Sequence, residues 1–196
     1  MKKLQYLKIG EVFKYELFDW IKLDDLEDGT LAIMKDRLPD TRRFDEDSNN
    51  WRNSELRNWL NNNFLHTLID NGAKEDNFLR FERDLTADDG MKDYGNLSDR
   101  LSLITCEEYR KYRNLIPIIN NWWWTLTPYS CVGKYSCYVR CVYTDGSLND
   151  VDANIACTGI RPICNLKHGL LVSTIEDKEL LERIDNESKR FFRMVF

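Results

Sequence analysis

Charged and apolar side chains alternate closely in the first part of the chain. This mixing between Gly10 and Trp20 is typical of a half-buried β-strand. The pair Asp28-Gly29 then separates the apolar residues 21–23 from residues 31–34, which indicates a hairpin. We therefore expect the chain to open with strands.

Helical spacing first appears after Asn53 and Ser54, either of which can cap a helix. Asn71-Gly72 supplies the end of this helix. The apolar residues between these points form one stripe: Leu56, Trp59, Leu60 and Phe64. Residues 61–63 are three asparagines, each of which costs about 0.5 kcal/mol relative to alanine in a helix. Either packing overrides this cost or the helix is shorter than the stripe.

The middle of the chain is more polar. Residues 39–50 read as an acidic loop, and its Asp45-Glu46-Asp47 segment resembles the start of a calcium loop but lacks the later glycine and glutamate. A solvated loop is therefore the expectation. Residues 73–98 are charged and broken by glycines, so we expect a mobile surface loop there. A short strand is expected at residues 101–104, and a helix follows from the capping box at Thr105 toward Pro117.

The second half carries three consecutive tryptophans, closed by Pro128, and later a corner formed by Gly159, Ile160, Arg161 and Pro162. We expect both to pack into a common β core that leaves the loops between them free. On a strand the tryptophans alternate sides, so one faces the core and one faces away. A strand at residues 135–143, a turn at Asp145-Gly146 and a returning strand at residues 151–155 complete this region.

Arg161 stands between two apolar residues, so we expect it to be partly buried and paired with a carboxylate. The candidates are Asp145, Asp150 and Asp152.

A last capping box lies at Ser173-Thr174-Ile175-Glu176, ahead of an apolar stripe at Leu180, Leu181 and Ile184. It predicts a third helix. We therefore divide the chain into a domain of residues 1–170 and a helical extension of residues 171–196, whose apolar end at residues 191–196 we expect to dock on the domain.

With 196 residues, 42% hydrophobic and 31% charged, the chain has the profile of one globular domain. The net charge of -5 argues against direct attraction to nucleic acid or to an anionic membrane. No signal peptide and no membrane span is visible, so we expect a cytoplasmic protein. Six cysteines without a paired metal-binding spacing predict buried, reduced thiols.

Three groups of residues together resemble a bacterial and phage domain family of unknown function. The first is Trp51, Ser54, Leu56, Arg57, Trp59, Leu60, Asn61 and Phe64, the second is the tryptophan run ending at Pro128, and the third is the Gly159–Pro162 corner with Leu166. Their order is a specific signal, although each alone is weak. The resemblance covers the chain from Leu7 to Leu166.

That family is similar to the C-type-lectin-like fold, which includes formylglycine-generating enzymes and the variable proteins of diversity-generating retroelements. The resemblance implies an α+β protein in which two helices flank small, twisted antiparallel sheets and long loops carry whatever is bound. The helix after residue 171 would be an addition. Where the family usually has an arginine between its tryptophan and proline, this chain has Trp124-Thr125-Leu126-Thr127-Pro128.

The related enzymes hold copper(I) with two closely spaced cysteines ahead of a Gly-Phe-Arg segment. Cys131 and Cys137, with Cys141, precede Gly159-Ile160-Arg161 in similar order but at a different spacing. A copper-dependent oxidase of this kind is therefore kept as the last alternative. The plainer interpretation of these cysteines is buried hydrophobic thiols.

No nucleophile triad, phosphate-binding loop or dinucleotide glycine pattern is present, which favours a non-enzyme without cofactor or metal. We expect a recognition module of bacterial or phage origin that binds a protein, or alternatively a glycan, through the loops of residues 121–152. The candidate contact residues are Trp122, Trp123, Trp124, Tyr129, Asn149, Asp152 and Arg161. The alternative is a phage-encoded inhibitor of a host defence nuclease of CRISPR type, using the acidic residues 24–28 and 45–47.

Overall fold

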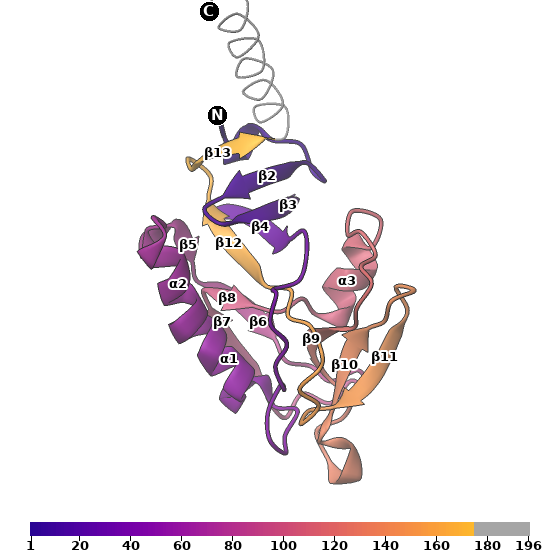
Figure 1. Ribbon diagram of the computed structural model, residues 1–196. Helices are drawn as coiled ribbons and strands as arrows, with labels where there is room; N and C mark the ends of the chain where they lie inside the picture. The colour runs from indigo at the N-terminus through magenta and orange to yellow at the C-terminus, as the bar shows by residue number, and fades with distance from the viewer. Residues whose placement is uncertain (175–196) are drawn as a thin grey trace, which may run out of the picture.

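The computed structural model describes residues 1–174 and is built mainly from antiparallel strands (Figure 1). The main sheet has the strand order β1-β13-β2-β3-β4-β12-β5, and β8 also pairs with β12. Its strands are β1 (Lys2–Lys3), β2 (Val12–Tyr15), β3 (Phe18–Asp25), β4 (Gly29–Met34), β5 (Phe78–Leu79), β8 (Leu101–Ser102), β12 (Ile163–Lys167) and β13 (Leu171–Thr174). The protein is therefore a mixed α and β structure, as the sequence predicts at this coarse level.

The predicted hairpin is confirmed. Strands β3 and β4 pair antiparallel around the Asp28-Gly29 turn, with Trp20 opposite Met34. A shift of register between Lys22 and Asp24 marks a bulge, which bends this part of the sheet. The tight turn between β2 and β3 contains Glu16 at a φ of 51°. Glycine or asparagine usually adopts this conformation, so the sequence gives no sign of it here.

The predicted first helix runs without a break over residues 55–70. It comprises α1 (Glu55–Trp59), a π-helical turn η3 (Leu60–Phe64) and α2 (Leu65–Asp70). Ser54 caps it by accepting a hydrogen bond from the backbone of Arg57. The three asparagines fall inside the π-helical turn, so the helix accommodates them by widening and does not end there.

The expectation of a loop at residues 73–98 is wrong outside residues 85–95, which carry no helix or strand. This stretch contains β5, a short hairpin of β6 (Phe81–Asp84) and β7 (Asn96–Asp99), and the helical turn η4 (Glu75–Asn77). In β6 the buried Phe81 and Arg83 alternate with the exposed Glu82 and Asp84. Because one inward position is a charged residue, the strand has no apolar alternation and escapes detection from the sequence.

The second half forms a three-stranded sheet of order β11-β10-β9. Its strands are β9 (Trp123–Pro128), β10 (Tyr138–Val142) and β11 (Leu148–Asp152). The strand expected from residue 135 thus begins at Tyr138, because η5 (Gly133–Tyr135) is a helical turn, and the returning strand begins earlier than expected. The capping box at Thr105 is confirmed and starts α3 (Cys106–Tyr112).

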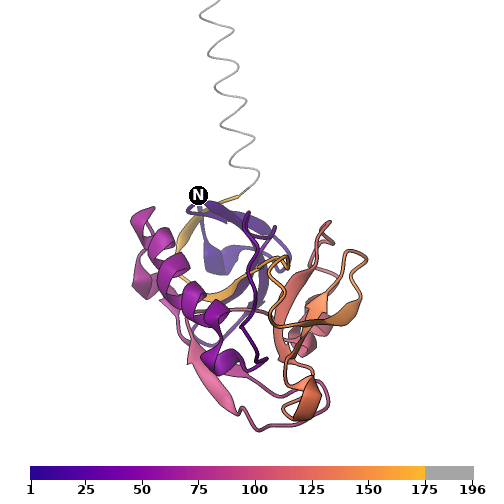
Figure 2. The same cartoon turned by 60° about the horizontal axis from the view of Figure 1, so that its bottom comes forward.

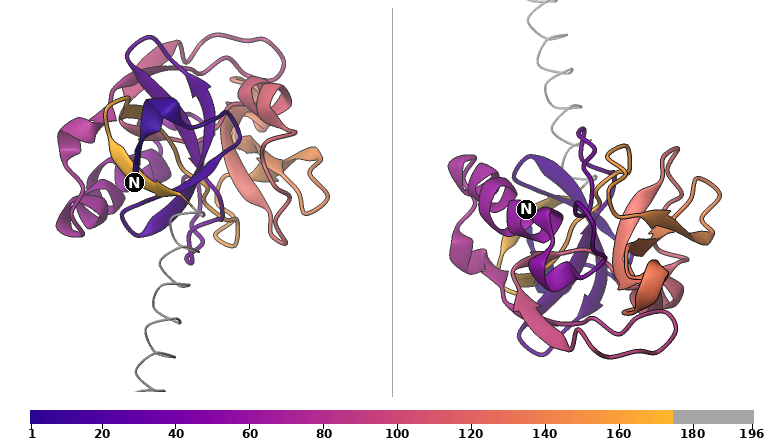
Figure 3. Two further views of the ribbon diagram at one scale, coloured as in Figure 1. Left: turned by 90° about the horizontal axis from the view of Figure 1, so that it is seen from above. Right: turned by 90° about the horizontal axis from the view of Figure 1, so that it is seen from below.

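Figures 1 and 2 show the α1–α2 helix on one flank of the main sheet and α3 with the second sheet on the other. The first hydrophobic core lies under α1–α2 and also includes Val139 and Cys141 of the second sheet, whereas the second core lies under α3. Trp20, Ala32 and Met34 of the main sheet point into the core under α1–α2, whereas Ile21 and Ile33 point into the core under α3. Views from above and below give the same arrangement (Figure 3).

The tryptophan run and the Gly-Arg-Pro corner do share a β core, as predicted. Trp124 points into the first core and Trp123 into the second, so the expected alternation is confirmed. Gly159 accepts from the backbone of Trp124 at 3.0 Å and donates to the carbonyl of Trp122 at 2.8 Å. A Cβ at residue 159 would lie 2.9 Å from that carbonyl oxygen, so only glycine fits.

The two ends of the described chain meet in the main sheet, where β13 pairs with both β1 and β2. Ser173 and Thr174, the expected start of the last capping box, belong to β13. The predicted third helix and the apolar end at residues 191–196 lie outside the described residues. None of the helices in residues 1–174 has the length and apolarity that a membrane crossing requires.

Candidate functional site

The three tryptophans do not form one binding platform. Trp123 and Trp124 are buried in the two cores, and the indole of Trp124 donates to the carbonyl of Arg42. Trp122 is 38% exposed and stacks on Tyr143 with ring centroids 4.2 Å apart. Only Trp122 of the three can therefore contact a partner directly.

Arg161 is fully buried, and the expectation that it pairs with a carboxylate is wrong. Its guanidinium donates to the backbone carbonyls of Met34, Lys35 and Pro117 and lies over the ring of Trp123. Burial lowers the pKa of Arg161 to about 10, which still leaves the side chain charged at neutral pH. The residue fastens three chain segments together and does not face solvent.

The other candidates from the 121–152 region are accessible. Tyr129 lies half-buried beside Tyr135, and Asn149 and Asp152 lie on the edge strand β11. We call residues 129–137, between β9 and β10, the tyrosine loop. Asn49 holds this loop from inside by donating to the carbonyls of Ser130, Tyr135 and Tyr138. Tyr129 thus projects from a fixed loop, and Asn149 and Asp152 project from a strand.

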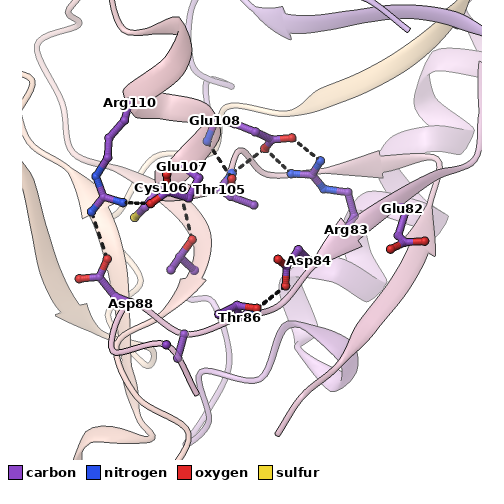
Figure 4. A pocket seen from close by; sticks show the side chains of 13 residues that line it. Glu82, Arg83, Asp84, Thr86, Asp88, Thr105, Cys106, Glu107, Glu108 and Arg110 are labelled. Atoms are coloured by element: carbon purple, nitrogen blue, oxygen red, sulfur yellow. Dashed lines mark hydrogen bonds and ion pairs between the residues drawn. The ribbon is translucent and has the colours of Figure 1, made fainter. Parts of the chain in front are cut away.

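A concave feature next to this region lies beneath the start of α3. We call it the first hollow; it has a volume of about 410 Å³ and lies between β6, the 86–90 loop and the first turn of α3 (Figure 4). Cys106 and Thr127 are among its lining residues. The backbone amide of Cys106 donates to the hydroxyl of Thr127 at 2.9 Å. Charged side chains make up much of the rest: Glu82, Arg83, Asp84, Asp88, Glu107, Glu108 and Arg110.

A second hollow of about 490 Å³ adjoins the first, and the two share Glu82, Arg83, Glu107 and Glu108. Its lining comes from the β3–β4 hairpin, β6 and α3. It includes three apolar side chains, Leu26, Leu31 and Phe81. We refer to the two hollows together as the α3 groove.

An ion pair separates the two hollows. Arg83 reaches Glu108 at 2.7 Å and 2.5 Å, and it also donates to the carbonyl of Leu103. Burial alone would raise the pKa of Glu108, but the charge and hydrogen bonds of Arg83, together with hydrogen bonds from Thr105, outweigh burial and lower it. Glu108 is therefore ionised at neutral pH and joins α3 to β6.

Further ion pairs continue from the α3 groove toward the predicted loops. Asp88 lies 3.2 Å from Arg110 on α3 and 3.3 Å from Arg140 on β10. Arg140 in turn lies 3.5 Å from Asp150 on β11. A chain of ion pairs therefore links the groove to the 121–152 region.

A comparison with protein families matches residues 71–168 to a domain of unknown function (DUF6273). These residues make up half of the 196-residue chain. The chain belongs to this family. No curated protein matches the chain. No solved structure matches it either.

The DUF6273 region includes the whole lining of the first hollow, the tryptophan run and the Gly-Arg-Pro corner. The Trp51–Phe64 motif lies outside it. That motif has a structural use in this chain, since Trp51 and Arg57 both donate to the buried carboxylate of Asp99. Asn61 in the same motif binds the backbone of Leu101.

The cysteines of this DUF6273 chain are distributed through both core and surface. Cys106, Cys141 and Cys164 are buried, Cys131 and Cys137 are partly exposed, and Cys157 is exposed. Burial raises the pKa of Cys106 and raises that of Cys141 to about 12, which keeps both thiols protonated at neutral pH. Within residues 1–174, no group of three or more histidine, cysteine or acidic side chains is placed to hold a metal ion.

Sequence reasoning missed half of the acidic residues of the α3 groove because Glu82, Asp84 and Asp88 lie in the stretch expected to be a loop. Glu82 and Asp84 are the exposed positions of β6, and Asp88 follows that strand. The capping box pointed to Glu108, but only as a helix signal. The alternation from Phe81 to Asp84 was the signal that could have revealed a strand with one acidic face.

Proposed function

We propose that this chain is a non-enzymatic recognition module that binds a partner protein at the α3 groove and the adjoining 121–152 surface. The observation that carries the proposal is the pair of adjoining hollows, about 410 Å³ and 490 Å³, built around α3 within and beside the DUF6273 region. Side chains that hold the fold together, such as Arg161 and Arg57, donate their hydrogen bonds to other groups of the same chain. The groove side chains instead line space that a ligand can enter.

The charged and thiol groups of the groove support a binding role over acid–base chemistry. Glu108 has a lowered pKa because of Arg83 and Thr105, which together outweigh its burial, and burial raises the pKa of Cys106. Neither group is poised to exchange a proton near neutral pH, where a general acid or base works best.

We further propose that the architecture is C-type-lectin-like. Three features support this: β1 and β13 from the two ends of the described chain pair together, α1–α2 and α3 cover opposite faces of the main sheet, and the second sheet is inserted between α3 and β12. An experimental structure that superposes on known lectin-like domains over both sheets would support the assignment. A different strand order would overturn it.

The two alternatives from the sequence gain no specific support. The acidic residues 24–28, offered as the surface of a nuclease inhibitor, are partly engaged, since Asp24 binds Lys111 and Tyr112 and Asp28 accepts from Asn165. For the copper oxidase, Cys141 lies in the core, whereas Cys131 and Cys137 bond to backbone carbonyls of their surroundings. Both alternatives remain predictions.

Site-specific photocrosslinking tests the proposed function. A photoreactive phenylalanine analogue is placed at Glu107, which is exposed and lines both hollows, and separately at Asn63, which is exposed on the opposite flank. A third position, Val132, reports on the tyrosine loop. We expect the same partner protein to be crosslinked in cells from Glu107 and from Val132, and not from Asn63. Crosslinks from Asn63 alone, or from none of the positions, would refute the proposal.

A further inference from the structure

We infer that the α3 groove takes a basic segment of the partner protein, with a lysine or arginine side chain in the first hollow and an apolar side chain in the second. This inference rests on the proposed function and adds the chemical class of the ligand. It follows from the balance of charges around the groove, from the apolar part of the second hollow, and from the way the two hollows adjoin.

The groove carries a surplus of negative charge. Its lining includes six carboxylates against three cations, namely Asp24, Glu82, Asp84, Asp88, Glu107 and Glu108 against Arg83, Arg110 and Lys111. Each cation is already paired: Arg83 with Glu108 at 2.5 Å, Arg110 with Glu107 at 2.5 Å, and Lys111 with Asp24 at 2.8 Å. Asp88 is shared between Arg110 and Arg140.

Glu82 and Asp84 are the carboxylates left over. Among residues 1–174, no lysine or arginine lies within ion-pair distance of either one. Glu82 accepts only the amide of Asn96, and Asp84 accepts the backbone amide and hydroxyl of Thr86. Both carboxylates are exposed and line the first hollow, so a cationic side chain entering there meets uncompensated negative charge.

The second hollow favours a different side chain. Leu31 and Phe81 are nearly buried at its base, and Leu26 is half-buried beside them. An apolar group placed here removes hydrophobic surface from water, mainly that of Leu26. Lys111 and Asp24 at the same hollow are already paired with each other, so they offer no free charge to a ligand.

The two hollows meet across the first turn of α3, and their shared residues Glu82, Arg83, Glu107 and Glu108 form the boundary. A ligand that fills both must extend past that boundary. A peptide segment does so naturally, because side chains of neighbouring residues can enter adjacent hollows while the backbone lies over the Arg83–Glu108 pair. A lone cation fills only the first hollow.

Panning a phage-displayed random heptapeptide library against the full chain tests this inference, with the selected peptides then measured by fluorescence polarisation. The variant E82Q/D84N removes the uncompensated charges while keeping shape. The matched control E46Q/D47N removes two exposed carboxylates from the 39–50 loop, outside the groove. Circular dichroism and the urea midpoint verify that all three proteins are folded alike.

We expect enrichment of peptides in which lysine or arginine stands close to leucine, isoleucine or phenylalanine. Their affinity should fall about fivefold to tenfold in E82Q/D84N and change by less than about twofold in E46Q/D47N. It should also weaken as salt is raised toward about 1 M, because screening reduces the attraction.

Three outcomes would overturn the inference: no enrichment, enrichment of acidic or uncharged peptides, or equal weakening in both variants. Peptide binding that is abolished by EDTA and restored by calcium would also overturn it, because a metal ion would then be the occupant. If the peptides fail while Glu107 still crosslinks a partner, the groove remains a docking site and only its ligand class is wrong.

Discussion

Asn61 illustrates how a single side chain can join a helix to a strand. Its amide group donates to the carbonyls of Leu101 at 2.8 Å and Arg57 at 3.1 Å, and its oxygen accepts from the backbone of Leu101 at 3.1 Å. These bonds take the place of a neighbouring strand along β8. The π-helical turn in which Asn61 lies sets the position of this side chain, while Asn62 and Asn63 in the same turn are exposed.

The variant Asn61→Ala should therefore lower the free energy of unfolding by roughly 2 kcal/mol, because it leaves buried backbone groups without partners. The neighbouring Asn63→Ala should be neutral or stabilise the protein by about 0.5 kcal/mol, because alanine is the better helix former. Urea unfolding of both variants measures the difference. Equal effects at the two positions would show that the bonds to Leu101 contribute nothing.

At the residue scale, burial was easier to predict from the sequence than bonding. The opposite orientations of Trp123 and Trp124 follow from the two-residue period of a strand, and they were predicted. The burial of Arg161 was also expected, but its partners were not. The identity of a residue indicates what its burial costs, whereas the choice between a carboxylate and backbone carbonyls depends on segments that come together only in the fold.

At the scale of elements, α3 is fastened at its first turn by one glutamate with two roles. Glu108 accepts from the backbone of Thr105 at 2.8 Å, which completes the capping box, and it pairs with Arg83 of β6. The capping box depends on residues three apart and was predicted from sequence. The link to β6 joins residues 25 positions apart, and β6 itself was missed because a charged residue holds an inward position.

The Arg83–Glu108 pair should make stability depend on pH. The pKa of Glu108 is lower in the folded state than its ordinary value, so its stabilising contribution is present at neutral pH and is lost as the pH falls through the folded pKa. Glu108→Gln cannot ionise and lacks this contribution. Its free energy of unfolding should lie roughly 2 kcal/mol below that of the native chain at neutral pH. The gap should narrow below about pH 4.5, close to the ordinary pKa of glutamate.

Urea unfolding at a series of pH values measures this gap. Glu107→Gln is the matched control, because Glu107 is 85% exposed and its pair with Arg110 should contribute under about 1 kcal/mol. A gap for Glu108→Gln that stays constant with pH would contradict the assigned ionisation of this residue.

At the scale of the whole molecule, the main sheet is assembled from distant parts of the chain. β12 pairs with β4, β5 and β8, and β13 pairs with β1 and β2. The β3–β4 hairpin could be predicted because it joins neighbouring segments, but these long-range pairings have no local signal. The first hairpin, the first helix, the capping box of α3 and the β core of the tryptophan run could therefore be predicted from the sequence. The α3 groove could not, because it needs β3–β4, β6 and α3 side by side.

Arg161 lies where this assembly is held together. Its guanidinium donates to the carbonyls of Met34 and Lys35 at the end of β4 and of Pro117 after α3, and it covers Trp123 of β9. Arg161→Met keeps an apolar side chain of similar length but removes every one of these bonds. We expect it to lower the free energy of unfolding by roughly 3 kcal/mol, because three buried carbonyls lose a charged donor.

The control for this variant is Arg113→Met, since Arg113 is exposed and covers the ring of Tyr109 at 5.7 Å. It should cost less than about 1 kcal/mol. Because Arg161 joins the end of β4 to the segment after α3 and covers Trp123 of β9, its loss should also speed amide hydrogen exchange in α3 and β9. The effect on the α1–α2 helix, which packs in the first core, should be smaller. Uniform exchange, or a cost no larger than that of Arg113→Met, would mean that the two flanks of the sheet are held together by hydrophobic packing and not by this buried cation.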